Sequence, residues 1–376
     1  MKRILSLDGG GIRGALSLGY LQKIEDILRD RHKNIISPDK FRLCQYFDMI
    51  GGTSTGSIIA AALATGLKVS EIKEKYFKLG EKIFGEKYDW WNPLETFRYL
   101  KARYNHKPLE NELKNVFGDI TLGSDKILTA LCVVSKRADT NSTWLFHNNP
   151  NGRFFDSELG MNKYLPLWEI VRSSTAAPTY FVPQLLNVGN DITGAFVDGG
   201  VSMANNPALE LFKVATMKGF CYQWPVGAYK LLLISVGTGN AEYFSKTTEV
   251  TDNWVLSWAT EIPSMLMSDA SWNNQTILQW ISKCPKGKMI DMEIGDLKNE
   301  CPFKEPLLTY FRYNQILSVD DLNKLGLRTF SDDDVESLKE MSNARNCSIL
   351  YDIGRAAAEK EIDSEDFPQV FDIKNR

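Results

Sequence analysis

The stretch Gly52-Thr53-Ser54-Thr55-Gly56 follows an apolar run at Tyr46–Ile50 and opens a run of small residues at Thr55–Ala64. A strand, a sharp glycine turn and a helix in this order are typical of the nucleophile elbow, G-x-S-x-G. Both glycines are needed, because a side chain at either position would clash in so tight a turn. We therefore expect Ser54 to be exposed at the N-terminus of the helix, whose dipole favours a developing negative charge.

A second glycine-rich turn, Asp8-Gly9-Gly10-Gly11-Ile12-Arg13-Gly14, lies between a strand at Ile4–Leu7 and a helix at Ala15–Arg31. It contains G-x-G-x-x-G, the dinucleotide fingerprint, which also requires an acidic residue at the end of the second strand. Here the second strand ends in another glycine turn. Backbone N–H groups of Gly9–Gly11 would equally converge on an anion, as in an oxyanion hole, with Arg13 adding positive charge. Taken alone, this motif also fits a purely structural turn.

A third turn, Phe196-Val197-Asp198-Gly199-Gly200, ends an apolar strand in a carboxylate and so offers a base for the serine. The α/β-hydrolase order is serine, acid and then histidine. The chain has three histidines, all before this acid: His32, His106 and His147. We expect His32 to be solvated in its charged stretch and His147 to have a structural role. The sequence therefore favours Asp198, and not a histidine, as the base for Ser54.

Apolar strands alternate with helical patterns along the first 240 residues, and further strands are predicted at Ile127–Ser135, Ser142–Phe146, Ala195–Val197 and Lys230–Val236. This alternation is the signature of an α/β fold with a mainly parallel sheet, whose site lies at the carboxyl ends of the strands. Beyond residue 240, helical spacing predicts helices at Trp254–Ile281 and Asp332–Glu361. We therefore expect a catalytic domain over 1–240 and a mostly helical C-terminal extension over 241–376, packed on the core.

Composition excludes several classes of function. Lys and Arg number 44 against 47 Asp and Glu, a net charge of −3, which argues against a protein that binds a nucleic acid polymer. The six cysteines form no C-x-x-C pair and have no histidine at zinc-ligand spacing, so we expect neither a metal nor a cofactor. No apolar leader follows Met1, and the longest apolar runs are shorter than the ~20 residues that span a bilayer. We expect a cytoplasmic protein.

The three turns, in this order, resemble the signatures of the patatin-like phospholipase family. Three supporting stretches match as well: Ser173–Phe181, Asn205-Asn206-Pro207 and Val236–Gly239. The resemblance covers residues 1–240 and implies a three-layer α/β fold. It implies that Ser54 is the nucleophile, that Asp198 is its base, and that Gly9, Gly10, Gly11 and Arg13 form the oxyanion hole. The motif glycines are Gly14, Gly52, Gly56, Gly199 and Gly200, and the family often has alanine at the last position, a change that we expect to be harmless.

The resemblance also implies an activity, the hydrolysis of fatty acyl esters of glycerophospholipids at a membrane surface. The extension resembles bacterial members more than plant storage patatins. Some such bacterial proteins resemble effectors of antiviral defence that degrade the cell's own membrane, which implies a cyclic di- or trinucleotide activator, action at the inner face of the membrane and a homo-oligomer. Two alternatives are a nucleotide-dependent oxidoreductase and a catalytically silent lipid- or nucleotide-binding signalling module. Retention of both Ser54 and Asp198 favours an active enzyme.

Two aromatic-rich segments, Tyr88–Pro93 and the helix at Trp254–Ile281, are candidates for membrane contact, since Trp and Tyr favour the boundary between lipid and water. For both we favour packing against the protein core or a partner chain.

Overall fold

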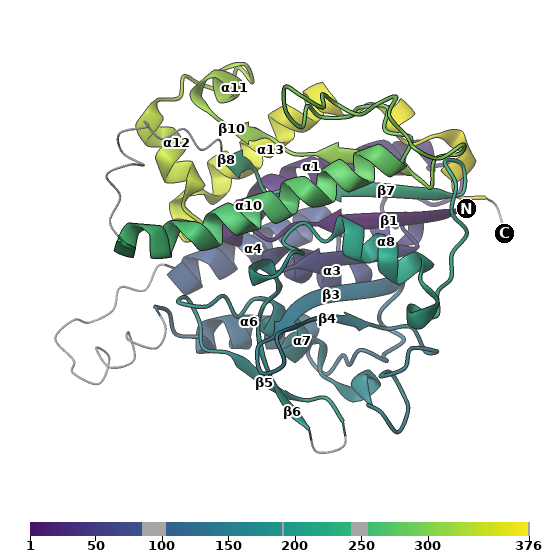
Figure 1. The fold of residues 1–376 in the computed structure, drawn as a ribbon, viewed down its shortest axis with the longest axis vertical. Helices are drawn as coiled ribbons and strands as arrows, with labels where there is room; N and C mark the ends of the chain where they lie inside the picture. The colour runs from purple at the N-terminus through teal and green to yellow at the C-terminus, as the bar shows by residue number, and fades with distance from the viewer. Residues whose placement is uncertain (85–102, 190–191, 242–254, 375–376) are drawn as a thin grey trace.

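The computed structural model describes residues 1–84, 103–189, 192–241 and 255–374. The chain forms three layers, with a central sheet between two layers of helices (Figure 1). This confirms the predicted α/β fold. The aromatic segment Tyr88–Pro93 lies outside the described residues.

The central sheet has eight strands in the order β5-β6-β3-β2-β1-β7-β9, with β4 paired to β3. The parallel strands are β1 (Lys2–Leu7), β2 (Met49–Thr53), β3 (Ala130–Arg137), β7 (Leu231–Val236) and β9 (Thr309–Tyr313). The antiparallel strands are β4 (Ser142–His147), β5 (Gln184–Asn187) and β6 (Thr193–Asp198). A second sheet pairs β8 (Asn240–Ala241) with β10 (Ile316–Leu317). The prediction of a mainly parallel sheet is therefore confirmed.

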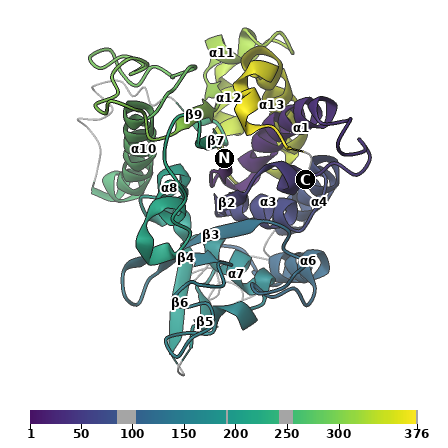
Figure 2. The same cartoon turned by 90° about the vertical axis from the view of Figure 1, so that its right-hand side faces the viewer.

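Helices cover both faces of the sheet (Figure 2). One face packs against α1 (Gly14–Arg31), α3 (Thr55–Ala64), α4 (Val69–Phe84), α6 (Lys107–Phe117), α7 (Leu167–Ser174) and α13 (Cys347–Glu361). The other packs against α8 (Ala208–Thr216) and α10 (Val255–Ile281). Side chains of a strand alternate between the faces, so Leu5 and Leu7 join the first core whereas Ile4 joins the second.

Short elements connect these layers. Within the described ranges, the other α-helices are α2 (Leu43–Tyr46), α11 (Val319–Asn323) and α12 (Asp332–Lys339). The 3₁₀ turns are η1 (Gly11–Arg13), η2 (Asn162–Tyr164), η3 (Gly199–Val201), η4 (Lys218–Phe220), η5 (Ala344–Asn346), η6 (Ser364–Asp366) and η7 (Gln369–Phe371). Of these, η1 and η3 lie at the carboxyl ends of β1 and β6, where the sequence placed the functional site.

Residues beyond 240 contribute to the same sheet and the same core. Strand β9 pairs in parallel with β7, and α13 packs on α1. Ion pairs link the two helices, with Arg355 Nη1 lying 3.1 Å from Asp26 Oδ2 and Lys23 contacting Glu359. The carboxyl end of β9 therefore reaches the same edge of the sheet as the glycine turns.

Three local expectations were wrong. The strand predicted at Tyr46–Ile50 is Met49–Thr53, because the preceding apolar residues form α2. The helix predicted over Asp332–Glu361 is two helices, and between them the Asn346 side chain bonds the Ser337 carbonyl, a competition with helical bonding that Asn favours. His32 is buried and not solvated, since its ring nitrogens bond the Leu28 carbonyl and the Ile373 N–H.

Candidate active site

Ser54 occupies a strained turn between β2 and α3. Its backbone angles are φ 53° and ψ −129°, in a region that residues other than glycine rarely adopt. A Cβ at Gly52 would lie 2.3 Å from the Gly56 carbonyl oxygen, and a Cβ at Gly56 would lie 2.4 Å from that of Leu7. The expectation that both glycines are needed for so tight a turn is therefore confirmed.

Asp198 reaches Ser54 because two strand ends meet along one edge of β3. Strand β2 pairs with the first part of β3, up to Thr53 opposite Val134, whereas β6 pairs with the last part, with Asp198 opposite Ser135. Strand β4 occupies the other edge of β3 over the same residues. Since β2 is parallel to β3 and β6 antiparallel, their carboxyl ends face each other. Residues 144 positions apart in the chain are thereby brought into contact.

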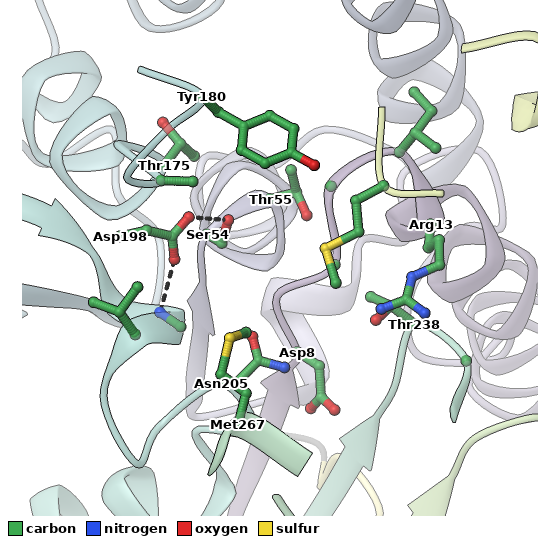
Figure 3. A pocket seen from close by; sticks show the side chains of 18 of the residues that line it. Asp8, Arg13, Ser54, Thr55, Thr175, Tyr180, Asp198, Asn205, Thr238 and Met267 are labelled. Carbon is green, nitrogen blue, oxygen red and sulfur yellow. Dashed lines mark hydrogen bonds between the residues drawn. The ribbon is translucent and has the colours of Figure 1, made fainter. Parts of the chain in front are cut away.

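The two side chains form a hydrogen-bonded pair (Figure 3). Ser54 Oγ donates to Asp198 Oδ2 at 2.5 Å, and the Gly200 N–H donates to Asp198 Oδ1 at 2.7 Å. Burial of the carboxyl, which is 5% exposed, raises the pKa of Asp198 to about 6, while the hydrogen bonds from Ser54 and Gly200 and the charge of Arg172 act in the opposite direction. Asp198 is therefore more basic than a free aspartate but still ionised at neutral pH.

The end of α7 and the residues that follow it hold both members of this pair. Ser174 Oγ accepts the Ser54 N–H at 2.8 Å and donates to the Val134 carbonyl at 2.5 Å. The Ala176 carbonyl accepts the Asp198 N–H at 3.0 Å. In the sequence, Ser173–Phe181 was singled out only because this stretch matches the resembled family. Its contacts give it a physical role, since it fixes the backbone on both sides of the pair.

The glycine loop after β1 lies against Ser54, and a Cβ at Gly9 would come within 3.0 Å of Ser54 Cβ. The Gly9 N–H donates to the Asn205 carbonyl at 3.0 Å, so this group is already engaged. The Ile12 N–H donates to the Met341 carbonyl at 2.8 Å. Among the described residues, the N–H groups of Gly10 and Gly11 have no carbonyl acceptor. Of the three backbone N–H groups expected to stabilise the oxyanion, those of Gly10 and Gly11 therefore have no competing backbone acceptor within the described part of the chain.

A cavity of about 1110 Å³ opens at Ser54 and Asp198. This volume is slightly above the range of about 300–1,000 Å³ that is usual for small-molecule pockets. Apolar side chains from η1, from helices α3, α4 and α6 and from the segment after α7 line it: Ile12, Ile58, Leu79, Ile83, Phe84, Leu109, Tyr180 and Phe181. Asp8, Arg13, Thr238 and Asn205 lie around the same cavity (Figure 3). An apolar acyl group and a polar group would both find complementary walls in this space.

Comparison with known proteins decides the family. Residues 5–212, more than half of the chain, match the family model described as patatin-like phospholipase. The chain belongs to the patatin-like phospholipase family. Patatin-1-Kuras 2 from Solanum tuberosum is 28% identical over 392 residues, covering 99% of this chain and 90% of that protein. Patatin-17 from Solanum cardiophyllum is 28% identical over 390 residues, covering 99% of this chain and 87% of that protein.

A bacterial relative matches a shorter part of this chain. The cGAMP-activated phospholipase of Escherichia coli strain TW11681 is 31% identical over 246 residues, which cover 64% of this chain and 63% of that protein. The plant patatins align with the C-terminal third as well, so the extension does not by itself set this chain apart from them. Among solved structures, VipD from Legionella pneumophila covers 93% of this chain and 66% of its own, with 13% identity and a TM-score of 0.35, too low to carry an argument.

None of the three histidines is among the described residues that line the cavity. His147 ends β4, on the edge of β3 away from β2, and its ring contacts Phe220 and Tyr222. Burial lowers the pKa of His147 to about 4, so its imidazole is neutral at physiological pH. These contacts favour a structural role for His147.

Gly200, where the family often has alanine, leaves little room for a side chain in this protein. A Cβ there would lie 2.9 Å from Asn205 Oδ1 and 3.1 Å from Asp198 Oδ1. The N–H of the same residue bonds the Asp198 carboxylate. Glycine therefore fits the observed arrangement, whereas alanine would require the Asn205 side chain to move.

Two further observations concern the described residues only. Those residues contain no group of three or more His, Cys, Asp or Glu side chains arranged to hold a metal ion. None of the helices that they form has the length and apolar character needed to cross a bilayer.

Proposed function

We propose that this protein hydrolyses fatty acyl esters of membrane glycerophospholipids, with Ser54 as nucleophile and Asp198 as base. The observation that carries this proposal is the 2.5 Å hydrogen bond from Ser54 Oγ to the buried Asp198 carboxylate, both of which line a partly apolar cavity. Membership of the patatin-like phospholipase family supports a lipid acyl hydrolase.

In the proposed acylation step, Ser54 Oγ attacks the ester carbonyl carbon while its proton passes to Asp198 Oδ2. The N–H groups of Gly10 and Gly11 stabilise the negative oxygen of the tetrahedral intermediate, an effect worth about 3–4 kcal/mol for one donor in known hydrolases. When the intermediate collapses, the bond between the acyl carbon and the alcohol oxygen breaks. Asp198 returns the proton to that oxygen, and a lysophospholipid leaves.

In the proposed deacylation step, the same carboxylate takes a proton from water. The resulting hydroxide attacks the acyl-enzyme, the same two N–H groups stabilise the second oxyanion, and the fatty acid departs as Ser54 recovers its proton. The pKa of about 6 suits both steps, because the carboxylate is ionised at pH 7 and yet a better proton acceptor than a free aspartate.

Likeness to the cGAMP-activated phospholipase of E. coli supports a proposal about regulation. We propose that the enzyme acts from the cytoplasm on the inner face of the membrane, is activated by a cyclic di- or trinucleotide, and serves antiviral defence by degrading the cell's own membrane. Residues 241–376 offer the regulatory surface, and a site shared by two subunits of a homo-oligomer would couple activation to assembly.

The alternative is a module that binds lipid or nucleotide without turnover. Vesicles of phosphatidylethanolamine and phosphatidylglycerol, incubated with the purified protein, separate the two when free fatty acids and lysophospholipids are measured by mass spectrometry. We expect equal amounts of both products from the wild type and none from Ser54→Ala. The matched control is Ser271→Ala, because Ser271 lines the same cavity from α10. Vesicles left intact by the activated wild type would support the silent module.

A further inference from the structure

A buried ion pair joins the glycine loop to the C-terminal third of the chain. Arg312 Nη1 lies 2.9 Å from Asp8 Oδ1, and Arg312 Nη2 lies 2.5 Å from Asp8 Oδ2. The guanidinium therefore donates two parallel hydrogen bonds to the carboxylate. Arg312 Nη1 also donates to Ser235 Oγ at 2.7 Å. Both charged side chains are almost fully buried, with 5% of Asp8 and 2% of Arg312 exposed.

This pair adjoins the glycine loop of the proposed oxyanion hole. Asp8 is the last residue before Gly9, and both Asp8 and Arg312 line the cavity that contains Ser54. Arg312 comes from β9, outside the residues that the family model matches, and it reaches past β7 to the end of β1. The pair therefore connects a strand of the C-terminal third to the glycine loop that lies against Ser54.

The neighbours of Arg312 on β9 hold the adjoining loop as well. The Gly237 N–H donates to the Tyr313 carbonyl at 2.9 Å, and the Gly239 N–H donates to Asn314 Oδ1 at 2.8 Å. Between these two glycines, Thr238 Oγ1 donates to the Gly9 carbonyl at 2.9 Å. The glycine loop is thus held through two routes that start at β9, one through Asp8 and one through Thr238.

Asp8 without a partner would harm catalysis in two ways. A buried carboxylate that loses its cation either takes up a proton or moves toward solvent, and Asp8 lines the cavity that contains Ser54. Movement of Asp8 would displace the adjacent glycine N–H groups, and its negative charge would oppose the negative oxygen that forms beside Ser54. A displacement of 1 Å in a catalytic group costs about 100-fold in rate.

We propose that Arg312 is a positioning residue for the oxyanion hole, because it holds Asp8 in place and neutralises its charge. This inference rests on the proposed function and makes the C-terminal third a necessary part of the site. Lysine is not an equivalent at this position, since it carries a single ammonium group and cannot grip both carboxylate oxygens in parallel.

The test compares kcat and KM of the wild type and the variants for a soluble short-chain p-nitrophenyl ester. Any activator that the wild type requires is present, and the temperature is well below the melting temperature of each variant. We expect kcat of Arg312→Gln to fall about 100-fold with KM within a factor of three, and Arg312→Lys to be intermediate. Adding Asp8→Asn to Arg312→Gln removes the unpaired charge and should recover part of the loss. The control is Arg3→Gln, which breaks the 2.9 Å pair with Asp48 at the other end of β1 and should lower stability but not kcat.

A kcat of folded Arg312→Gln within twofold of the wild type would overturn the inference. If that variant does not fold, the neutral double variant carries the test, and a kcat within twofold of the wild type would again refute it. Hydrogen exchange gives an answer that does not depend on activity. The Asp8 and Gly9 amides, which donate to the Val236 and Asn205 carbonyls, should exchange faster in Arg312→Gln than in Arg3→Gln. If the wild type hydrolyses no ester, the proposed function is refuted. The exchange rates of these two amides then still test whether Arg312 holds the glycine loop, and equal rates in Arg312→Gln and Arg3→Gln would show that it does not.

Discussion

Replacement of Asp198 by asparagine should abolish hydrolysis and, at the same time, stabilise the folded protein at pH 8. Burial raises the pKa of this carboxyl from its ordinary 3.8 to about 6. The folded state therefore binds the proton more tightly than the unfolded state, so the free energy of unfolding falls as the pH rises from about 4 to about 6 and stays low above that range. At 1.36 kcal/mol for each pKa unit, the ionised carboxylate costs about 3 kcal/mol at pH 8.

Asparagine has the same shape, keeps an oxygen for the Gly200 N–H and carries no charge. Urea unfolding of wild type and Asp198→Asn at pH 4, 5, 6, 7 and 8 measures the difference. We expect the variant to be more stable by about 2–3 kcal/mol at pH 8 and by almost nothing at pH 4. The control is Ser54→Ala, which is also inactive but keeps the carboxylate and so should keep the pH dependence. Equal stability of wild type and Asp198→Asn at pH 8, or a difference that does not change with pH, would refute the reasoning.

Three further predictions concern activity. The kcat/KM for a soluble ester should rise with pH through about 6 and level off above, because Asp198 must be ionised to act as base; a profile that falls over this range would contradict this role. His147→Ala should retain most of the activity, since its neutral ring packs on Phe220 away from the cavity; a loss as large as that of Asp198→Asn would indicate a triad. Release of fatty acid from vesicles should increase with one member of a panel of cyclic di- and trinucleotides. To raise the active fraction from 1% to 99%, that nucleotide must bind the active state about 10⁴-fold more tightly than the inactive state. Full activity without any nucleotide would exclude this regulation.

Local patterns in the sequence predicted the elements whose cause is local. The elbow at Ser54 and the helix Thr55–Ala64 were found because glycine spacing and small side chains dictate a tight strand–helix turn. The strand ending at Asp198 was found for the same reason. The boundaries were less certain where an apolar run changes from helix to strand, as it does between Tyr46 and Met49, since both forms bury the same side chains.

Contacts between distant segments could not be predicted from one sequence. Nothing near Arg312 indicates that it pairs with Asp8, 304 positions earlier, because the pairing depends on the order of β1, β7 and β9 in the sheet. The sequence suggested a solvated His32 because its neighbours in the chain are charged. In the structure its ring stacks on Phe41 and accepts a hydrogen bond from the Ile373 N–H, 341 positions away. The engagement of the Gly9 N–H by Asn205 was equally hidden.

In the proposed mechanism, Ser54 forms the covalent intermediate. A fluorophosphonate probe bonds to an activated serine, and mass spectrometry of the digested protein locates the adduct. We expect one adduct on the peptide that contains Ser54 in the wild type, none in Ser54→Ala and much slower labelling in Asp198→Asn, where the base of the 2.5 Å pair is lost. An adduct on a different residue, or labelling of Ser54 at the same rate without the carboxylate, would contradict the Ser54–Asp198 mechanism.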